Sequence, residues 1–190
     1  MTEIVGILLA AGRSRRFGSD KRLQPLADGT PMVLASARKL AAACPRTIVV
    51  VRPDDTELAR LLADAGLETV VCPSAELGMG HSLAAGVAAC PDADGWLVAL
   101  ADMPYIAAAS YHVVRDALQR GATLVRPVHG GRPGHPVGFA AEHRSALLAL
   151  TGDQGGKAIL EAHCATLTVC PVDDPGVLDD VDLPGQIAVP

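Results

Sequence analysis

Short apolar runs alternate with amphipathic stretches along most of this chain. The first run, Ile4–Leu9, is apolar throughout, which is typical of a parallel strand buried on both faces. Thr47–Val51 is rich in β-branched residues and Trp96–Leu100 is again continuously apolar, so both predict strands. Shorter runs predict further strands over Glu68–Cys72, Thr123–Arg126, Val137–Ala140 and Ala165–Cys170.

Stretches with helical spacing of apolar residues lie between these runs. The first helix is predicted to take Thr30 as its N-cap and Pro31 as its first residue, and to end near Cys44. Asp54 or Asp55 is predicted to cap the second helix. Gly78–Cys90 is predicted to be a loop that enters a third helix. Further helices are predicted over Ser110–Arg120, Glu142–Leu150 and Asp153–His163.

Strands that alternate with helices at these intervals predict βαβ units with right-handed crossovers. The sequence therefore predicts a single α/β domain over residues 1–190, with a mostly parallel, Rossmann-like sheet between two layers of helices. Ligands of such sheets bind outside the carboxyl ends of the strands. Gly12 and Asp102 each lie just past the end of a predicted strand, so we expect both at one edge of the sheet.

Composition narrows the range of partners. The net charge of −5 argues against a nucleic-acid surface and leaves anion binding to local clusters. No apolar run approaches the roughly 20 residues that span a bilayer, and the acidic Glu3 does not fit a signal peptide. The 5 cysteines are odd in number and lack a C-x-x-C pair. We therefore expect small buried thiols in a reducing cytoplasm and no zinc site.

The segment Leu8–Lys21, LLAAGRSRRFGSDK, carries the clearest candidate chemistry. Its small residues let backbone N–H groups approach a ligand, and its cations suit a polyphosphate. The G-x-x-x-x-G-K-[ST] pattern does not fit because no Ser or Thr follows Lys21, and G-x-G-x-x-G does not fit because Ser14 replaces the second glycine. The simple alternative is a basic surface turn after a buried strand.

Two distinctive turns carry polar side chains. Asp102, in LADMP, directly follows a predicted strand, where a carboxylate suits Mg²⁺. A cap of the following turn would explain Asp102 equally well, so the residues alone leave both interpretations open. In Gly130–Val137, glycine and proline predict a tight loop from which Arg132 and His135 project. A lone histidine is more often structural.

Glycines mark two further candidates. In Gly78–Val87, Gly80 allows close approach of a ligand, and Ser82 either caps a helix or binds a ligand. A plain N-cap is the simpler interpretation of Ser82. Gly152–Lys157 is predicted to place two glycines in the first turn of a helix, whose free N–H groups form an anion site.

Together these segments resemble nucleotidyltransferases, specifically the molybdenum cofactor cytidylyltransferases and their guanylyl relatives. The loop matches L-A-A-G-x-S-x-R-[hydrophobic]-G-x-x-K, and G-M-G-x-S-L, LADMP and G-H-P-V follow in order. The segment Asp180–Pro184 is similar to the family's D-x-D-T-P, although Leu183 replaces Thr and Gly185-Gln186 replace an acidic pair. Lys157 stands where the family usually has Arg. The resemblance implies a three-layer α/β/α fold of the nucleotide-diphospho-sugar-transferase type.

The resemblance also implies roles for individual residues. Asp102 and Asp182 would hold Mg²⁺, with Asp180 in support, and Arg16 would contact the leaving pyrophosphate. The implied catalytic residues are Arg16, Lys21, Asp102 and His135, with His135 at the pterin substrate or the reacting phosphates. The implied nucleotide-binding residues are Leu9, Ala10, Ala11, Gly12, Ser14, Lys21, Gly80, Ser82 and Asp102. Relatives with LAAG tend to use CTP, so Ala11 favours CTP over GTP.

The implied reaction transfers CMP from CTP to the terminal phosphate of a molybdopterin-type cofactor and releases pyrophosphate. A phosphate monoester is largely ionised at neutral pH, so no general base is required. A molybdenum hydroxylase would be the partner that receives the product. Catalysis would depend on positioning and on charge stabilisation by Mg²⁺ and the cations.

Three other functions remain open at this point. The acceptor could be another phosphorylated compound, such as a sugar or polyol phosphate. The fold could instead support an NAD(P)H-dependent oxidoreductase similar to the nicotine blue oxidoreductases, because fold does not determine chemistry. The protein could also be a chaperone that delivers the cofactor to a partner enzyme.

Overall fold

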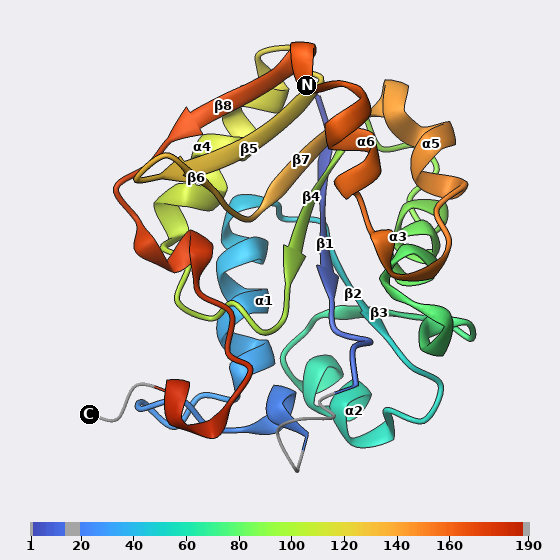
Figure 1. Ribbon diagram of the computed structural model, residues 1–190. Helices are drawn as coiled ribbons and strands as arrows, with labels where there is room; N and C mark the ends of the chain where they lie inside the picture. Colours follow the sequence, from blue (N-terminus) through green and yellow to red (C-terminus); the bar gives the residue numbers. More distant parts are fainter. Residues whose placement is uncertain (1, 14–19, 188–190) are drawn as a thin grey trace.

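A single mixed sheet forms the centre of the computed structural model, which describes residues 2–13 and 20–187 (Figure 1). Within these residues the sheet has eight strands in the order β3-β2-β1-β4-β7-β5-β6, and β8 pairs with β5 outside this path. No helix within the described residues is long and apolar enough to cross a membrane.

Parallel strands make up the first half of the sheet, as predicted. They are β1 (Ile4–Leu9), β2 (Thr47–Val51), β3 (Glu68–Val71) and β4 (Gly95–Leu100). The central strand β1 pairs with β2 on one side and β4 on the other, and all of its residues are buried. Leu9 is in register with Leu100, so the chain leaves β1 and β4 at the same height on the same edge.

The second half of the sheet is mixed. It contains β5 (Leu124–His129), β6 (Arg132–Pro133), β7 (Val137–Ala140) and β8 (Leu167–Pro171). Strand β7 runs antiparallel to both β4 and β5, and the short hairpin between β5 and β6 is absent from the sequence-based prediction. Because β7 is antiparallel to β4, the residues just before β7 lie at the carboxyl edge of β4.

Helices cover both faces, which confirms the three-layer arrangement (Figure 1). One face carries α1 (Met32–Ala43), α2 (Thr56–Asp64) and α4 (Ala108–Gln119). The other carries α3 (Met79–Ala88), α5 (Arg144–Leu148) and α6 (Lys157–Ala162). Strand β1 supplies both cores, because alternate side chains point to opposite faces: Leu8 packs in the first core and Ile7 in the second.

Several predicted element ends are wrong. Pro31, not Thr30, is the N-cap of α1, and no side chain caps that helix. Asp55 is the N-cap of α2, but its carboxylate is used elsewhere and makes no capping bond. The predicted helices after residue 140 are shorter, and each is preceded by a 3₁₀ turn. The 3₁₀ turns are η1 (Lys21–Leu23), η2 (Ala75–Leu77), η3 (Ala141–His143), η4 (Gly152–Gln154), η5 (Cys164–Thr166), η6 (Pro175–Leu178) and η7 (Pro184–Gln186).

The cysteine prediction holds for three residues. Cys44, Cys72 and Cys90 are buried free thiols, whereas Cys164 is exposed and Cys170 is partly exposed. The last two lie in η5 and in β8, which pairs on one side with β5, so no helix layer or second strand covers them fully.

Candidate active site

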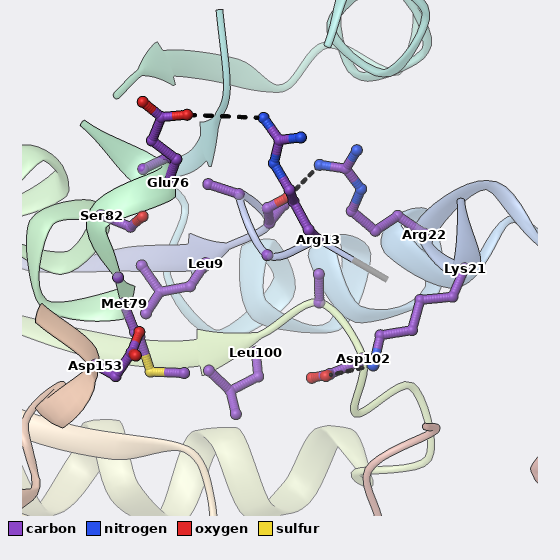
Figure 2. Close-up of a pocket in the computed structure, with 16 residues that line it drawn as sticks. Leu9, Arg13, Lys21, Arg22, Glu76, Met79, Ser82, Leu100, Asp102 and Asp153 are labelled. Atoms are coloured by element: carbon purple, nitrogen blue, oxygen red, sulfur yellow. Dashed lines mark hydrogen bonds and ion pairs between the residues drawn. The ribbon is translucent and has the colours of Figure 1, made fainter. Parts of the chain in front are cut away.

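A cavity of about 470 Å³ opens at the carboxyl edge of β1 and β4 (Figure 2). Segments from six places in the chain line it: Leu9–Arg13, Lys21–Arg22, Ala75–Glu76, Gly78–Met79 with Ser82, Leu100–Asp102, and Asp153. Figure 2 shows Lys21 and Asp102 at one end of the cavity and Ser82 and Asp153 at the other. Gly12 and Asp102 therefore share one edge of the sheet, as the sequence predicts.

The small residues after β1 form part of the cavity wall. Ala10 and Ala11 are buried, and the Ala10 N–H is bonded to the carbonyl of Val50, which holds the chain against the sheet. A Cβ added at Gly12 would meet no atom of the described residues within 4 Å. Packing therefore does not require this glycine, and its bare backbone is open to a ligand. Ser14 and Arg16 lie outside the described residues.

A buried ion-pair cluster connects η1 to Ala10, just after β1, and to Asp55. The Arg22 guanidinium donates to Asp55 at 2.7 Å and 2.6 Å, to Asp20, and to the carbonyl oxygen of Ala10. Arg52 donates to Asp55 as well, at 2.7 Å. Burial opposes the charge on Asp55, but the bonds from Arg22 and Arg52 outweigh it and lower the pKa of Asp55 to about 2. Arg22 was not singled out from the sequence, because its partner Asp55 lies 33 residues away along the chain.

Lys21 joins the two predicted metal carboxylates. Its Nζ lies 2.9 Å from Oδ2 of Asp102, 3.1 Å from Oδ1 of Asp182 and 2.8 Å from the carbonyl oxygen of Val181. Burial works against the ammonium charge, but the bonds to Asp102 and Asp182 outweigh it and raise the pKa of Lys21 above its ordinary value. Lys21 is therefore charged at neutral pH.

The position of Asp182 depends on how the C-terminal segment is anchored. Val181 is buried against Met32 of α1, and its N–H donates to the carbonyl of Asp102 at 2.8 Å. Gln186 accepts hydrogen bonds at 2.7 Å from the N–H groups of Asp182 and Leu183. Figure 1 shows this segment in red. It runs from β8 to the blue part of the chain that leads into α1.

The glycines of α3 serve packing. A Cβ on Gly78 would lie 2.3 Å from the carbonyl carbon of Gly152, and one on Gly80 would lie 2.8 Å from the carbonyl oxygen of Thr151. Gly80 does not line the cavity; it lets the 151–152 backbone approach the helix. Gly78 is the N-cap of α3, so the prediction that Ser82 caps this helix is wrong. Ser82 is buried within the helix and lines the cavity.

The segment Gly152–Lys157 also differs from the prediction. Helix α6 begins at Lys157, so Gly155 and Gly156 precede the helix and do not form its first turn. Gly156 is packed against Phe139, where a Cβ would lie 2.6 Å from the ring. The Lys157 side chain is exposed and lies 3.7 Å from Glu161, so this segment supplies Asp153 to the cavity but no cation.

His135 lies beside the cavity and does not line it. The loop before β7 places His135 at the carboxyl edge of β4, and its backbone N–H donates to the carbonyl of Val177 at 2.9 Å. Its Nδ1 atom is buried and has no hydrogen-bond partner within the described residues. Burial and the nearby Arg126 outweigh the charge of Asp102 and lower the pKa of His135 to about 4, so the imidazole is neutral at physiological pH.

The fold and this cavity together define an α/β/α protein of the nucleotide-diphospho-sugar transferase fold, with small residues and a charged lysine–carboxylate group at the carboxyl edge of its sheet. The chain belongs to the family of the MobA-like NTP transferase domain, whose model matches residues 6–167.

Similar proteins cover nearly the whole chain. The purine catabolism protein PucB of Bacillus subtilis is 28% identical, over 96% of this chain and 93% of its own. Nicotine blue oxidoreductase of Paenarthrobacter nicotinovorans is 29% identical, over 97% of this chain and 94% of its own.

Solved structures confirm the predicted fold. The crystal structure of Rv0371c from Mycobacterium tuberculosis is 27% identical with a TM-score of 0.84, covering 97% of this chain and 96% of that chain. A manganese complex of Rv0371c is 25% identical with a TM-score of 0.76, over 90% of this chain and 89% of that chain. A nucleotidyl transferase from Methanothermobacter thermautotroptrophicus has a TM-score of 0.82 at 21% identity, covering 97% and 94% of the two chains.

Proposed function

We propose that this protein is a Mg²⁺-dependent cytidylyltransferase that transfers CMP from CTP to the terminal phosphate of a molybdopterin-type cofactor. The observation that carries this proposal is the position of Lys21, which lines the cavity together with Asp102 and whose Nζ lies 2.9 Å from Asp102 and 3.1 Å from Asp182. Membership of the MobA-like NTP transferase family supports the reaction class. A molybdenum hydroxylase would receive the product.

The oxygen atoms around Lys21 fit a hard divalent cation. The ammonium group already stands as a cation between two carboxylate oxygens and the Val181 carbonyl oxygen, which are the donor types that Mg²⁺ prefers. Among the described residues no three His, Cys, Asp or Glu side chains gather around one point. Two carboxylates suffice for Mg²⁺, because substrate phosphates and water supply its other ligands. The manganese complex of Rv0371c supports a divalent metal in this family.

In this proposal Asp102 and Asp182 hold the metal, which when bound would neutralise phosphate charge and polarise the reacting phosphate. The backbone at Ala11 and Gly12 donates N–H groups to the triphosphate. Lys21 turns from the carboxylates to the β- and γ-phosphates, where its charge stabilises the leaving pyrophosphate. Arg16 assists there, as the family resemblance implies.

The acceptor's phosphate monoester supplies the nucleophile. With its second pKa near 6 it is largely a dianion at pH 7, so no residue has to remove a proton from it. One acceptor oxygen bonds to the α-phosphorus of CTP, and the bond from that phosphorus to the bridging α–β oxygen breaks. Pyrophosphate leaves with the electron pair, and the transfer needs no other reactant.

The preference for CTP rests on Ala11. It is 4% exposed and lines the cavity between Ala10 and Gly12, in the LAAG form that the cytidylyltransferases share. A site matched to a pyrimidine leaves the additional polar groups of a purine unpaired, which disfavours GTP.

Turnover of nucleoside triphosphates tests the proposal. Each of the four is incubated with Mg²⁺ and purified molybdopterin-type cofactor while pyrophosphate release is followed. We expect release with CTP, and a loss of about 10²–10³-fold in Asp102→Asn, the scale seen when one preorganised electrostatic contact is removed. Asp173→Asn is the matched control: Asp173 is an exposed carboxylate of the C-terminal segment that carries Asp182, and its replacement should leave turnover unchanged. Undiminished release by Asp102→Asn would refute the metal role.

A second candidate is an NAD(P)H-dependent oxidoreductase, which the similarity to nicotine blue oxidoreductase over 97% of the chain favours. Thermal shift separates the two functions. A cytidylyltransferase is stabilised by CTP with Mg²⁺, and an oxidoreductase by NADPH alone, because only a ligand that binds the folded state raises the melting temperature. Transfer to a sugar or polyol phosphate is tested by replacing the acceptor in the pyrophosphate assay.

A further inference from the structure

Arg126 is a half-buried arginine without a carboxylate partner in the described part of the chain. It lies in the middle of β5, where its Nη2 atom donates one long bond of 3.3 Å to the carbonyl of Gly134. Its Nε atom is buried and makes no hydrogen bond within the described residues. Burial lowers the pKa of Arg126, and no nearby carboxylate counters this effect. By contrast, the buried Arg22 has two carboxylate partners, Asp20 and Asp55.

An unpaired buried charge is costly, because folding removes water from the group without supplying a counter-charge. Proteins retain such groups where a ligand supplies the missing charge. Apart from the long bond to the Gly134 carbonyl, Arg126 finds neither an acceptor for its Nε atom nor a counter-charge among the described residues, so the missing group is an anion. The planar guanidinium fork matches two oxygens of a phosphate.

A second unsatisfied group stands next to Arg126. Nδ1 of His135 is also buried without a hydrogen-bond partner in the described residues. A hydrogen bond connects Arg126 to the loop that carries His135, because the Gly134 carbonyl that accepts it directly precedes His135. His135 is close enough to both Arg126 and Asp102 for each charge to act on its imidazole. The neutral imidazole can offer a hydrogen bond to a phosphate without adding charge.

The position of this pair fits the acceptor side of the reaction. Strands β4 and β5 are both antiparallel to the strand between them, β7, so their carboxyl ends lie at one edge of the sheet. Asp102 lines the nucleotide cavity, and its charge also acts on His135. Neither Arg126 nor His135 lines the cavity. A phosphate held by the pair would therefore be separate from the triphosphate but next to the same carboxylate.

We propose that Arg126 and His135 bind the terminal phosphate of the acceptor, and that Arg126 is the principal anchor. This inference rests on the proposed function and adds a residue that the family motifs do not include. Arg126 holds two phosphate oxygens with its fork, and the third oxygen is left to form the bond to the α-phosphorus. His135 orients the phosphate by one hydrogen bond.

Binding of inorganic phosphate tests the site without turnover. The protein is saturated with CTP and Mg²⁺, which fills the triphosphate cavity, and phosphate binding is then measured by titration calorimetry. We expect Arg126→Met to weaken phosphate binding at least tenfold and Arg126→Lys, which keeps the charge but not the fork, to weaken it less. Arg132→Met removes an exposed guanidinium from the same hairpin and should leave binding unchanged.

The unliganded melting temperature separates a binding role from a structural one. Arg126→Met removes an unpaired buried charge, so the melting temperature should stay the same or rise by about 2–4 °C. A fall in the melting temperature, equal phosphate binding in Arg126→Met, or an equal loss in Arg132→Met would each overturn the inference.

The inference and the proposed function fail in different ways. If CTP is turned over and Arg126→Met leaves the acceptor KM unchanged, the phosphate anchor is wrong and the transferase stands. If no triphosphate is turned over but phosphate binding still depends on Arg126, the anion site stands and the cytidylyltransferase is wrong.

Discussion

Replacing Lys21 by Met should make the unliganded protein less stable and yet able to bind a divalent metal more tightly. Methionine keeps an unbranched side chain one atom shorter and removes the cation that lies 2.9 Å from Asp102 and 3.1 Å from Asp182. The Lys21 side chain is 13% exposed, and those of Asp102 and Asp182 are 28% and 45% exposed. Water can therefore compensate the two carboxylates in part, and the Val181 carbonyl oxygen loses a donor.

The magnitude follows from these contacts. A hydrogen bond to a charged group contributes about 1.5–3 kcal/mol, and exposure of the carboxylates reduces their share, so we expect a total loss of about 2–3 kcal/mol. For a chain of this length that loss lowers the melting temperature by about 5–10 °C. In the wild type a metal must first displace the ammonium from the same oxygens. Each 1.4 kcal/mol corresponds to a factor of about ten, so Lys21→Met should bind Mn²⁺ about tenfold more tightly without nucleotide.

Free Mn²⁺ measured by electron paramagnetic resonance, together with thermal unfolding, checks both effects. The matched control is Lys39→Met: Lys39 donates to the Pro104 carbonyl at 2.6 Å and contacts no predicted metal ligand, so its loss should leave Mn²⁺ affinity unchanged. Addition of Mn²⁺ should restore the melting temperature of Lys21→Met, which should nevertheless lose pyrophosphate release. Equal or weaker Mn²⁺ binding by Lys21→Met would show that Lys21 does not compete for a metal site.

Three further outcomes test the scaffold. Asp55→Asn removes a partner of a buried arginine and should cost about 3–5 kcal/mol in urea unfolding. The folded pKa of Asp55, about 2 against an ordinary 3.8, means that its stabilisation is complete above pH 4 and is lost as the pH falls through 2. Unfolding at pH 5, 3 and 2 should show this decline, which should be smaller in Asp55→Asn. Gly80→Ala would place a Cβ 2.8 Å from the carbonyl oxygen of Thr151 and should lower stability by about 1–3 kcal/mol, measured in the same way, whereas Gly12→Ala meets nothing and should be nearly neutral.

Much of the fold could be predicted from the sequence, because the signals involved are local. A strand buried on both faces is apolar throughout, and β1 follows that pattern residue by residue, as does β2 after Thr47. Helix positions followed from the spacing of apolar residues, although caps were less predictable: the carboxylate of Asp55 had a stronger partner elsewhere than the N-terminus of α2. The shared edge of Gly12 and Asp102 followed from topology, because parallel strands present their carboxyl ends together.

The sequence by itself therefore determined the layered fold and the meeting of Gly12 and Asp102 at one edge of the sheet. Tertiary structure decided which distant charges meet: Lys21 reaches Asp182 across 161 positions, Arg22 is buried against Asp55, and Arg126 is left with no carboxylate among the described residues. No local pattern contains this information, because ion pairing depends on distances in space and on the loss of water. The stability and the pKa of a half-buried charged group depend on its neighbours in the folded chain.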